Sequence, residues 1–109
     1  DVPAYMQGLD VGVIPFRGSD PYVQGINPNK VYQYLAAGLP VITTPLLDLA
    51  ARAPDLLFAA TPAEVEQALA VVLAAAPEPS RRRLLARPHD WDALAARMVA
   101  EIEARLAAA

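Results

Sequence analysis

Three short apolar runs alternate with helical segments along this chain, and that alternation limits the folds open to it. Residues 9–16, 40–44 and 56–60 are apolar or β-branched, and each is bounded by Pro, Gly or polar residues, as a short buried strand would be. The run 9–16 is expected to be buried on both faces. Strands that alternate with helices form parallel sheets with right-handed crossovers. The sequence therefore predicts an α/β fold in which about three parallel strands are flanked by helices.

Helix start and stop signals lie between and after these strands. Asp1 predicts the cap of a first short helix that ends at Gly8, and Asn27 followed by Pro28 predicts the cap and first residue of a helix that ends at Gly38. The intervening stretch 17–27 has no periodicity and is predicted to be a loop. Further helices are predicted over residues 46–53, 61–76, 80–86 and 90–109.

Composition narrows the class of protein. The chain has 109 residues, enough for one small domain, and its 55% hydrophobic content is too high for a disordered segment. The net charge of −3 argues against a nucleic-acid partner, and the absence of cysteine excludes disulfides, thiol catalysis and cysteine-ligated metal. No apolar stretch is long enough to span a bilayer. We therefore expect a soluble domain, and the absence of cysteine fits a reducing compartment such as the cytoplasm.

The expected sheet is small for a fold of this kind. Three strands leave an edge strand without a neighbour, and the chain begins at Asp1 with no initiator methionine or signal-like segment. Both observations predict that residues 1–109 form one incomplete domain whose other strands lie upstream. A homodimer that pairs two copies through the exposed sheet edge is a second prediction from the same feature.

The segment 27–45, NPNKVYQYLAAGLPVITTP, carries the chemistry. It places a helix N-terminus at the carboxyl end of a strand, which is where open α/β sheets bind ligands. The N–H groups and the dipole at that end of a helix favour an anion such as phosphate. Lys30 adds a positive charge in the first turn, and Gln33 is suited to hydrogen-bond sugar hydroxyls. On the residues alone, the equal alternative is that Lys30 is simply solvated and that Pro28 and Gly38 only mark the start and the end of a helix.

Two blocks of residues carry a resemblance to a known family. The first is DVGVIPF over residues 10–16, and the second is the pattern NPxKxYxYLAAGxPV over residues 27–41. Through these blocks, and through the order of its other segments, the chain resembles the carboxy-terminal domain of group 1 glycosyltransferases, which have the GT-B fold. The resemblance implies two nucleotide-binding-type domains that face each other across a cleft. It also implies that this domain holds a nucleotide-diphosphate sugar as donor substrate, with no metal and no separate cofactor.

The same resemblance implies a donor site. Many members have two glutamates separated by seven residues, the first at the donor sugar and the second at the ribose hydroxyls. Gly25 and Gln33 stand at those positions here, so both depart from the pattern. Because an amide accepts through one oxygen only, we expect Gln33 to weaken donor binding by about 1–3 kcal/mol relative to a carboxylate. Asn27, Asn29 and Lys30 become candidates for contact with the diphosphate or the donor sugar.

Residues outside this block have simpler interpretations. Arg17 follows the first strand and is a candidate for the donor phosphate or base, with an exposed loop arginine as the alternative. Arg81, Arg82 and Arg83 are expected on a solvated helix face, with peripheral contact at the inner membrane face as the alternative. His89 is expected to be structural. Three apolar residues of the last helix are expected to pack in a core, although the resemblance implies that part of this face is exposed when the domain stands alone: Trp91, Met98 and Ile102.

Taken together, these features predict a truncated Rossmann-like layer that forms the carboxy-terminal part of a nucleotide-sugar-binding domain. Its partners would be the donor and an amino-terminal acceptor domain, and the chain alone is expected to be inactive, with no catalytic residue of its own. The alternatives are a non-catalytic α/β interaction module, to which Gln33 points, and a sugar-nucleotide epimerase of the same fold. The predicted donor-binding residues are Arg17, Gly25, Asn27, Asn29, Lys30 and Gln33.

Overall fold

A parallel sheet of three strands forms the centre of the molecule. The computed structural model describes residues 1–17, 19–46 and 55–109. Its strands pair in the order β1-β2-β3, with Val13 of β1 beside Ile42 of β2, and Ile42 beside Leu57 of β3. This arrangement confirms the α/β fold and the truncated Rossmann-like layer. The strands are β1 (Gly12–Ile14), β2 (Val41–Thr43) and β3 (Leu56–Phe58).

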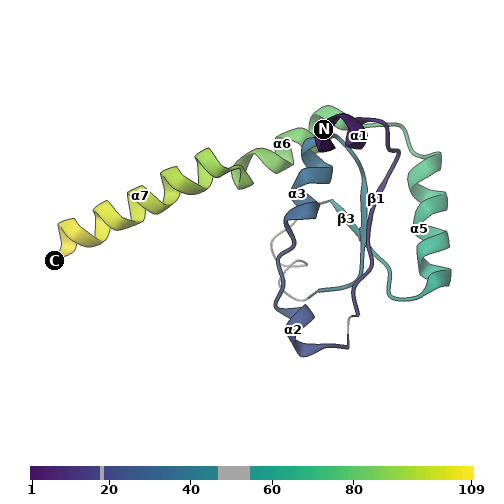
Figure 1. Ribbon diagram of the computed structural model, residues 1–109, viewed down its shortest axis with the longest axis horizontal. Coiled ribbons are helices and arrows are strands. Elements are labelled where there is room, and N and C mark those ends of the chain that lie inside the picture. The colour runs from purple at the N-terminus through teal and green to yellow at the C-terminus, as the bar shows by residue number, and fades with distance from the viewer. Residues whose placement is uncertain (18, 47–54) are drawn as a thin grey trace.

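Helices cover both faces of this sheet. Figure 1 shows α3 (Asn29–Ala36), which links β1 to β2, on one face and α5 (Pro62–Ala74), which follows β3, on the other. Thr61 caps α5, because its Oγ1 accepts from the backbone N–H of Glu64 at 3.2 Å, and the Glu64 carboxylate in turn accepts from the N–H of Ala60. The remaining elements are α1 (Val2–Gln7), α2 (Pro21–Gln24), α6 (Pro79–Ala86), the single turn η1 (Arg87–His89) and α7 (Trp91–Ala108).

Most of the buried apolar surface lies between α3 and the sheet. Val31 and Leu35, spaced four residues apart on one side of α3, are fully buried and pack with Ile14 and Val41. A smaller cluster on the opposite face joins Ile42 to residues of α5. The core therefore fixes which side of α3 faces the sheet, and the opposite side is left for solvent or a ligand.

A glycine fixes the end of α3. Gly38 has φ +83°, and the N–H groups of Gly38 and Leu39 donate to the carbonyls of Leu35 and Tyr34 at 2.9 Å each. This pairing is a Schellman motif, which needs a residue in the left-handed region at that position. The sequence prediction that the helix ends at Gly38 is confirmed.

All three strands are shorter than predicted, and β2 spans Val41–Thr43 rather than 40–44. Strand β1 spans Gly12–Ile14 rather than 9–16, and Val13 is 38% exposed, so the strand is not buried on both faces. The cause is the placement of α5, which packs on β2 and leaves the outer face of the edge strand open. Strand β3 ends at Phe58 instead of residue 60.

The predicted loop 17–27 contains a short helix, α2. Asp20 caps it by accepting from the backbone N–H of Tyr22 at 2.9 Å, and Pro21 is its first residue. Helix α6 begins at Pro79 rather than at residue 80. Of the helix predicted over 46–53, residues 47–53 lie outside the described residues.

Helix α7 extends away from the sheet and its helices, as Figure 1 shows. None of its residues is buried, and Trp91, Met98 and Ile102 are 80%, 65% and 51% exposed. The prediction that these three residues pack in a core is wrong, because α7 meets the rest of the molecule mainly at η1 and no described element lies along its length. None of the described helices is both long and apolar enough to cross a membrane.

Candidate functional site

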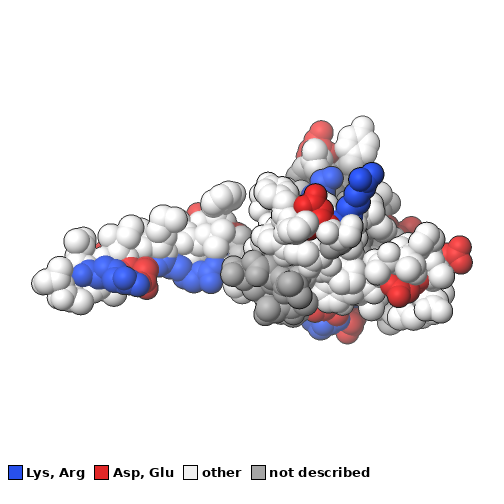
Figure 2. Space-filling view, turned by 90° about the horizontal axis from the view of Figure 1, so that it is seen from below, with Lys and Arg blue, Asp and Glu red and all other residues white. Residues whose placement is uncertain are grey.

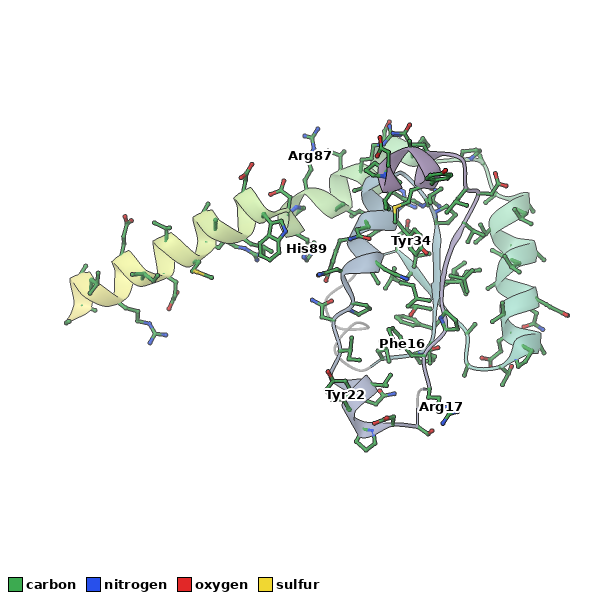
Figure 3. All side chains as sticks on the ribbon, viewed as in Figure 1. Phe16, Arg17, Tyr22, Tyr34, Arg87 and His89 are labelled. Atoms are coloured by element: carbon green, nitrogen blue, oxygen red, sulfur yellow. The ribbon has the colours of Figure 1, made fainter. Side chains whose placement is uncertain are left out.

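The carboxyl ends of the three strands meet the N-terminus of α3 at one edge of the sheet. Figure 3 shows Phe16, Arg17 and Tyr22 at this end of the molecule. Two side chains form hydrogen bonds between the segments at this edge. Thr44 Oγ1 accepts from the N–H of Phe16 at 2.9 Å and donates to the Phe16 carbonyl at 3.0 Å. Gln24 Nε2 donates to the carbonyl of Pro45 at 3.3 Å. The loops after β1 and β2 are thereby joined to each other and to α2 (Pro21–Gln24).

Helix α3 begins one residue later than predicted. Pro28 occupies the cap position with φ −72° and ψ 130°, and Asn29 is the first helical residue. Asn27 is therefore not the cap. Its Oδ1 instead accepts from the hydroxyl of Tyr32 at 2.9 Å. Because Pro28 has no side-chain acceptor, the first N–H groups of α3 are left without a cap.

Three of the predicted donor-binding residues share the outer side of α3. Asn29, Lys30 and Gln33 are all exposed, on the side of the helix away from buried Val31 and Leu35. Within the described part of the chain, none of the three side chains forms a hydrogen bond or ion pair. Lys30 places its charge in the first turn, where the helix dipole is also positive. This side of α3 is thus polar, unpaired and favourable to an anion.

Two hollows flank Gln33. The first, of about 350 Å³, lies between α1 and α3 and is lined on the α1 side by Val2, Pro3 and Met6. The second, of about 250 Å³, lies where α3 faces the start of α7, and Asn29 lines it together with Gln33. We call this second space the elbow hollow, because it sits where the chain turns from α6 through η1 into α7.

One wall of the elbow hollow is a pair of stacked rings. Tyr32 and His89 have ring centroids 4.2 Å apart and an interplanar angle of 23°. The hydroxyl of Tyr32 is held by Asn27, as described above, and Figure 3 places His89 beside α3 at the turn into α7. Burial, and to a smaller extent the charge of Arg97, lower the pKa of His89 below 6.5. His89 is therefore a neutral packing residue near pH 7.

That depressed pKa gives a testable pH dependence. Because folded His89 binds a proton less readily than unfolded His89, the unfolded state takes up more protons as the pH falls through 6.5. We expect the free energy of unfolding to fall on acidification through this range, and the loss to be smaller in His89→Gln. Urea unfolding of both proteins above and below pH 6.5 measures the difference. Equal pH slopes for the two proteins would contradict the assignment.

The other predicted site residues lie outside the elbow hollow. Arg17 is exposed beyond β1, and Lys30 does not line the hollow. Gly25 ends α2 with φ −89°, and a Cβ there would meet only the carbonyl oxygen of Tyr22, at 3.7 Å. The backbone at Gly25 would accept a side chain, so its conformation does not explain the absence of a glutamate.

The arginine run of α6 differs from the solvated face that was predicted. Arg81 Nη2 lies 2.9 Å from carboxylate oxygens of both Asp55 and Glu78. Arg82 Nε lies 3.3 Å from the same Asp55 oxygen, and its side chain is only 12% exposed. Two of the three charges are thus paired because acidic residues lie against α6. Figure 2 likewise shows basic and acidic groups interspersed over the described residues of the face it presents.

Four aromatic or acidic residues that line the elbow hollow have no predicted functional role: Tyr32, His89, Asp90 and Trp91. Tyr32 lies inside the block 27–41, and Asp90 caps α7. Trp91 was assigned to a core. The sequence signal for an exposed Trp91 is its position directly after the cap residue, because the first residue of a helix that projects from the fold has few neighbours. In the described residues, no group of His, Asp or Glu could hold a metal ion.

The fold and the edge of α3 define this chain as a parallel α/β layer of the Rossmann-like class, with exposed polar residues where such layers bind ligands. Over 46 residues, 42% of its length, the chain is 46% identical to a protein of Bacillus subtilis (strain 168) named "Putative teichuronic acid biosynthesis glycosyltransferase TuaH". The aligned segment spans 11% of that relative. No family model and no solved structure matches the chain. A relation to a glycosyltransferase is therefore supported over part of the chain.

Proposed function

We propose that this chain forms the nucleotide-sugar donor-binding part of a glycosyltransferase and that the first two turns of α3 contact the donor. The observation that carries the proposal is the unpaired polar side of α3, formed by Asn29, Lys30 and Gln33 at the carboxyl edge of the sheet. The partial identity to a glycosyltransferase supports the same reading. A second domain would supply the contacts to the acceptor and the catalytic groups.

The chemistry of the donor matches these groups. The diphosphate is an anion, and it would accept from the uncapped N–H groups at the start of α3 while Lys30 neutralises its charge. A lysine in the first helical turn interacts unfavourably with the helix dipole, and a bound anion would offset that interaction. Gln33, one turn further along, would bond the ribose hydroxyls through its amide. Both contacts lie on the side of α3 that the core leaves open.

Titration calorimetry with UDP, GDP and ADP tests the proposal. We expect saturable binding of one of them, weakened about tenfold or more in Lys30→Ala, because a hydrogen bond to a charged group contributes about 1.5–3 kcal/mol. Arg105→Ala is the matched control, since it removes an exposed positive charge at the far end of α7. Gln33→Glu should strengthen binding by about 1–3 kcal/mol.

Folded protein that binds none of the three nucleotides would contradict the proposal and favour the non-catalytic interaction module. Binding that is unchanged in Lys30→Ala and in Gln33→Glu would place the nucleotide elsewhere on the molecule and would equally contradict the assignment to α3.

A further inference from the structure

The elbow hollow combines an exposed aromatic ring with unpaired hydrogen-bonding groups. Trp91, the only tryptophan of the chain, is 80% exposed at the mouth of the hollow, and its ring contacts no other aromatic ring among the described residues. The side-chain amides of Asn29 and Gln33 face the hollow from α3, and neither forms a hydrogen bond with another described residue. A ligand placed between them would meet a flat apolar surface on one side and amide donors and acceptors on the other.

A carboxylate completes this set. Asp90 Oδ1 accepts from the N–H of Ala93 at 2.7 Å, which fixes the side chain as the cap of α7. Its second oxygen has no hydrogen bond among the described residues. The stacked rings of Tyr32 and His89 join α3 to η1 along one wall of the hollow. The hollow therefore offers carboxylate and amide groups that can accept from, and donate to, several hydroxyls of one molecule.

The size and polarity of the hollow limit the ligand. Its volume of about 250 Å³ is below the ~300 Å³ at which pockets for drug-sized molecules begin, so it suits one small ring. The Asp90 carboxylate, which has one oxygen without a hydrogen bond among the described residues, and the neutral imidazole of His89 disfavour an anion in this space. Both groups suit hydroxyl groups instead. A sugar ring meets both requirements, because its C–H face is apolar and its edge carries hydroxyls.

We infer that the elbow hollow binds the ring of a pyranose sugar, with one face against the indole of Trp91 and with hydroxyls bonded to Asn29 and Asp90, next to the Gln33 amide that is assigned to the ribose. The inference deepens the proposed function, on which it rests through the shared side of α3, and adds a sugar subsite at the start of α7. The ring could come from the sugar of a nucleotide donor or from a free saccharide. Experiment separates these two sources.

Intrinsic fluorescence gives a site-specific test, since Trp91 is the only tryptophan. The intact chain is titrated with methyl glycosides of the uncharged sugars glucose, galactose, mannose and N-acetylglucosamine, then with UDP-, GDP- and ADP-glucose and the matching free nucleotides. We expect a saturable change in Trp91 emission with sugar-bearing ligands and none with free nucleotides. A response to methyl glycosides assigns the ring to a free saccharide, and a response to nucleotide sugars alone assigns it to the donor.

Variants check the residues by calorimetry with the ligand that responds. Trp91→Ala and Asn29→Ala should each weaken binding about tenfold, Trp91→Phe should retain most of it, and Gln67→Ala on the exposed side of α5 should leave it unchanged. The absence of a saturable fluorescence change with every sugar overturns the inference. If calorimetry still detects nucleotide binding that is weakened in Lys30→Ala, the proposed function stands and only the sugar subsite fails. If a sugar responds and no nucleotide binds, the subsite stands and the donor assignment fails.

Discussion

Leu35→Ala is expected to lower the free energy of unfolding by about 2–5 kcal/mol. Leu35 is fully buried, and its side chain packs with Val31, Ile14 and Val41 where α3 meets the sheet. Removing it deletes buried apolar atoms and leaves a cavity that the surrounding strands can fill only in part. Since small domains have total stabilities of roughly 5–15 kcal/mol, this loss is a large share of the whole. Urea unfolding followed by far-ultraviolet circular dichroism measures it.

Leu73→Ala is the matched control for this variant. Leu73 lies on α5 and is 65% exposed, so the same change there should shift the stability by no more than about 0.5 kcal/mol. Should Leu35→Ala fail to fold, Leu35→Met keeps most of the volume and should cost less than about 1.5 kcal/mol. Equal losses in the free energy of unfolding for Leu35→Ala and Leu73→Ala would contradict the packing of α3 on the sheet described above.

Gly38→Ala is expected to produce the second large loss. An alanine at φ +83° costs about 1–2 kcal/mol in backbone strain, because its Cβ approaches the following carbonyl. That Cβ would also lie 2.6 Å from Pro79 Cβ and 3.0 Å from Pro79 Cα at the start of α6. Overpacking of this kind adds about 1–3 kcal/mol, because backbone must move to relieve it. Thermal and urea unfolding of the variant measure the sum.

Gly8→Ala is the comparison for Gly38→Ala. Gly8 also ends a helix, but its φ is −87° and a Cβ would meet only the carbonyl of Tyr5, at an ordinary 3.5 Å. We expect no loss at Gly8, so the two variants separate the demands of Gly38 from the general cost of losing a glycine. A Gly38→Ala variant as stable as Gly8→Ala would contradict the Schellman end of α3 and its contact with α6.

The arrangement of the sheet was predictable because its signals are local and strong. The runs 9–16, 40–44 and 56–60 contain the three strands, and Gly38 ends α3 as its sequence context predicts. Strand lengths were not predictable, because β1 and β3 are edge strands whose ends depend on where neighbouring elements stop covering them. The apolar run 9–16 shows this, since only Gly12–Ile14 pairs with β2.

The details of the candidate site depended on contacts that the sequence does not reveal. Asn27 and Pro28 read as a cap and a first helical residue, yet the helix starts one residue later and Asn27 binds the hydroxyl of Tyr32. Asn29 was predicted from the family resemblance, and Gln33 from the resemblance together with its position one turn after the start of the helix. Trp91 and His89 were not assigned to the site, because their proximity to α3 results from the turn between α6 and α7.

The apolar spacing of α7 gave a misleading prediction for a related reason. Trp91, Met98 and Ile102 recur at helical intervals, which is the pattern of a helix packed on a core. Periodicity indicates that a helix has an apolar side, but it does not identify what covers that side. In the described chain α7 projects from the layer, so this side is exposed.

The central claim is that the outer side of α3 binds a nucleoside diphosphate, and amide NMR tests it most directly. Titration of the ¹⁵N-labelled chain with UDP, GDP and ADP should give saturable shifts, for one of them, that are largest in the backbone amides of Asn29 and Lys30 and in the side-chain amide of Gln33. Amides of α5, on the opposite face of the sheet, should move little. A well-dispersed spectrum that no nucleotide changes, or saturable shifts confined to α5, would contradict the account.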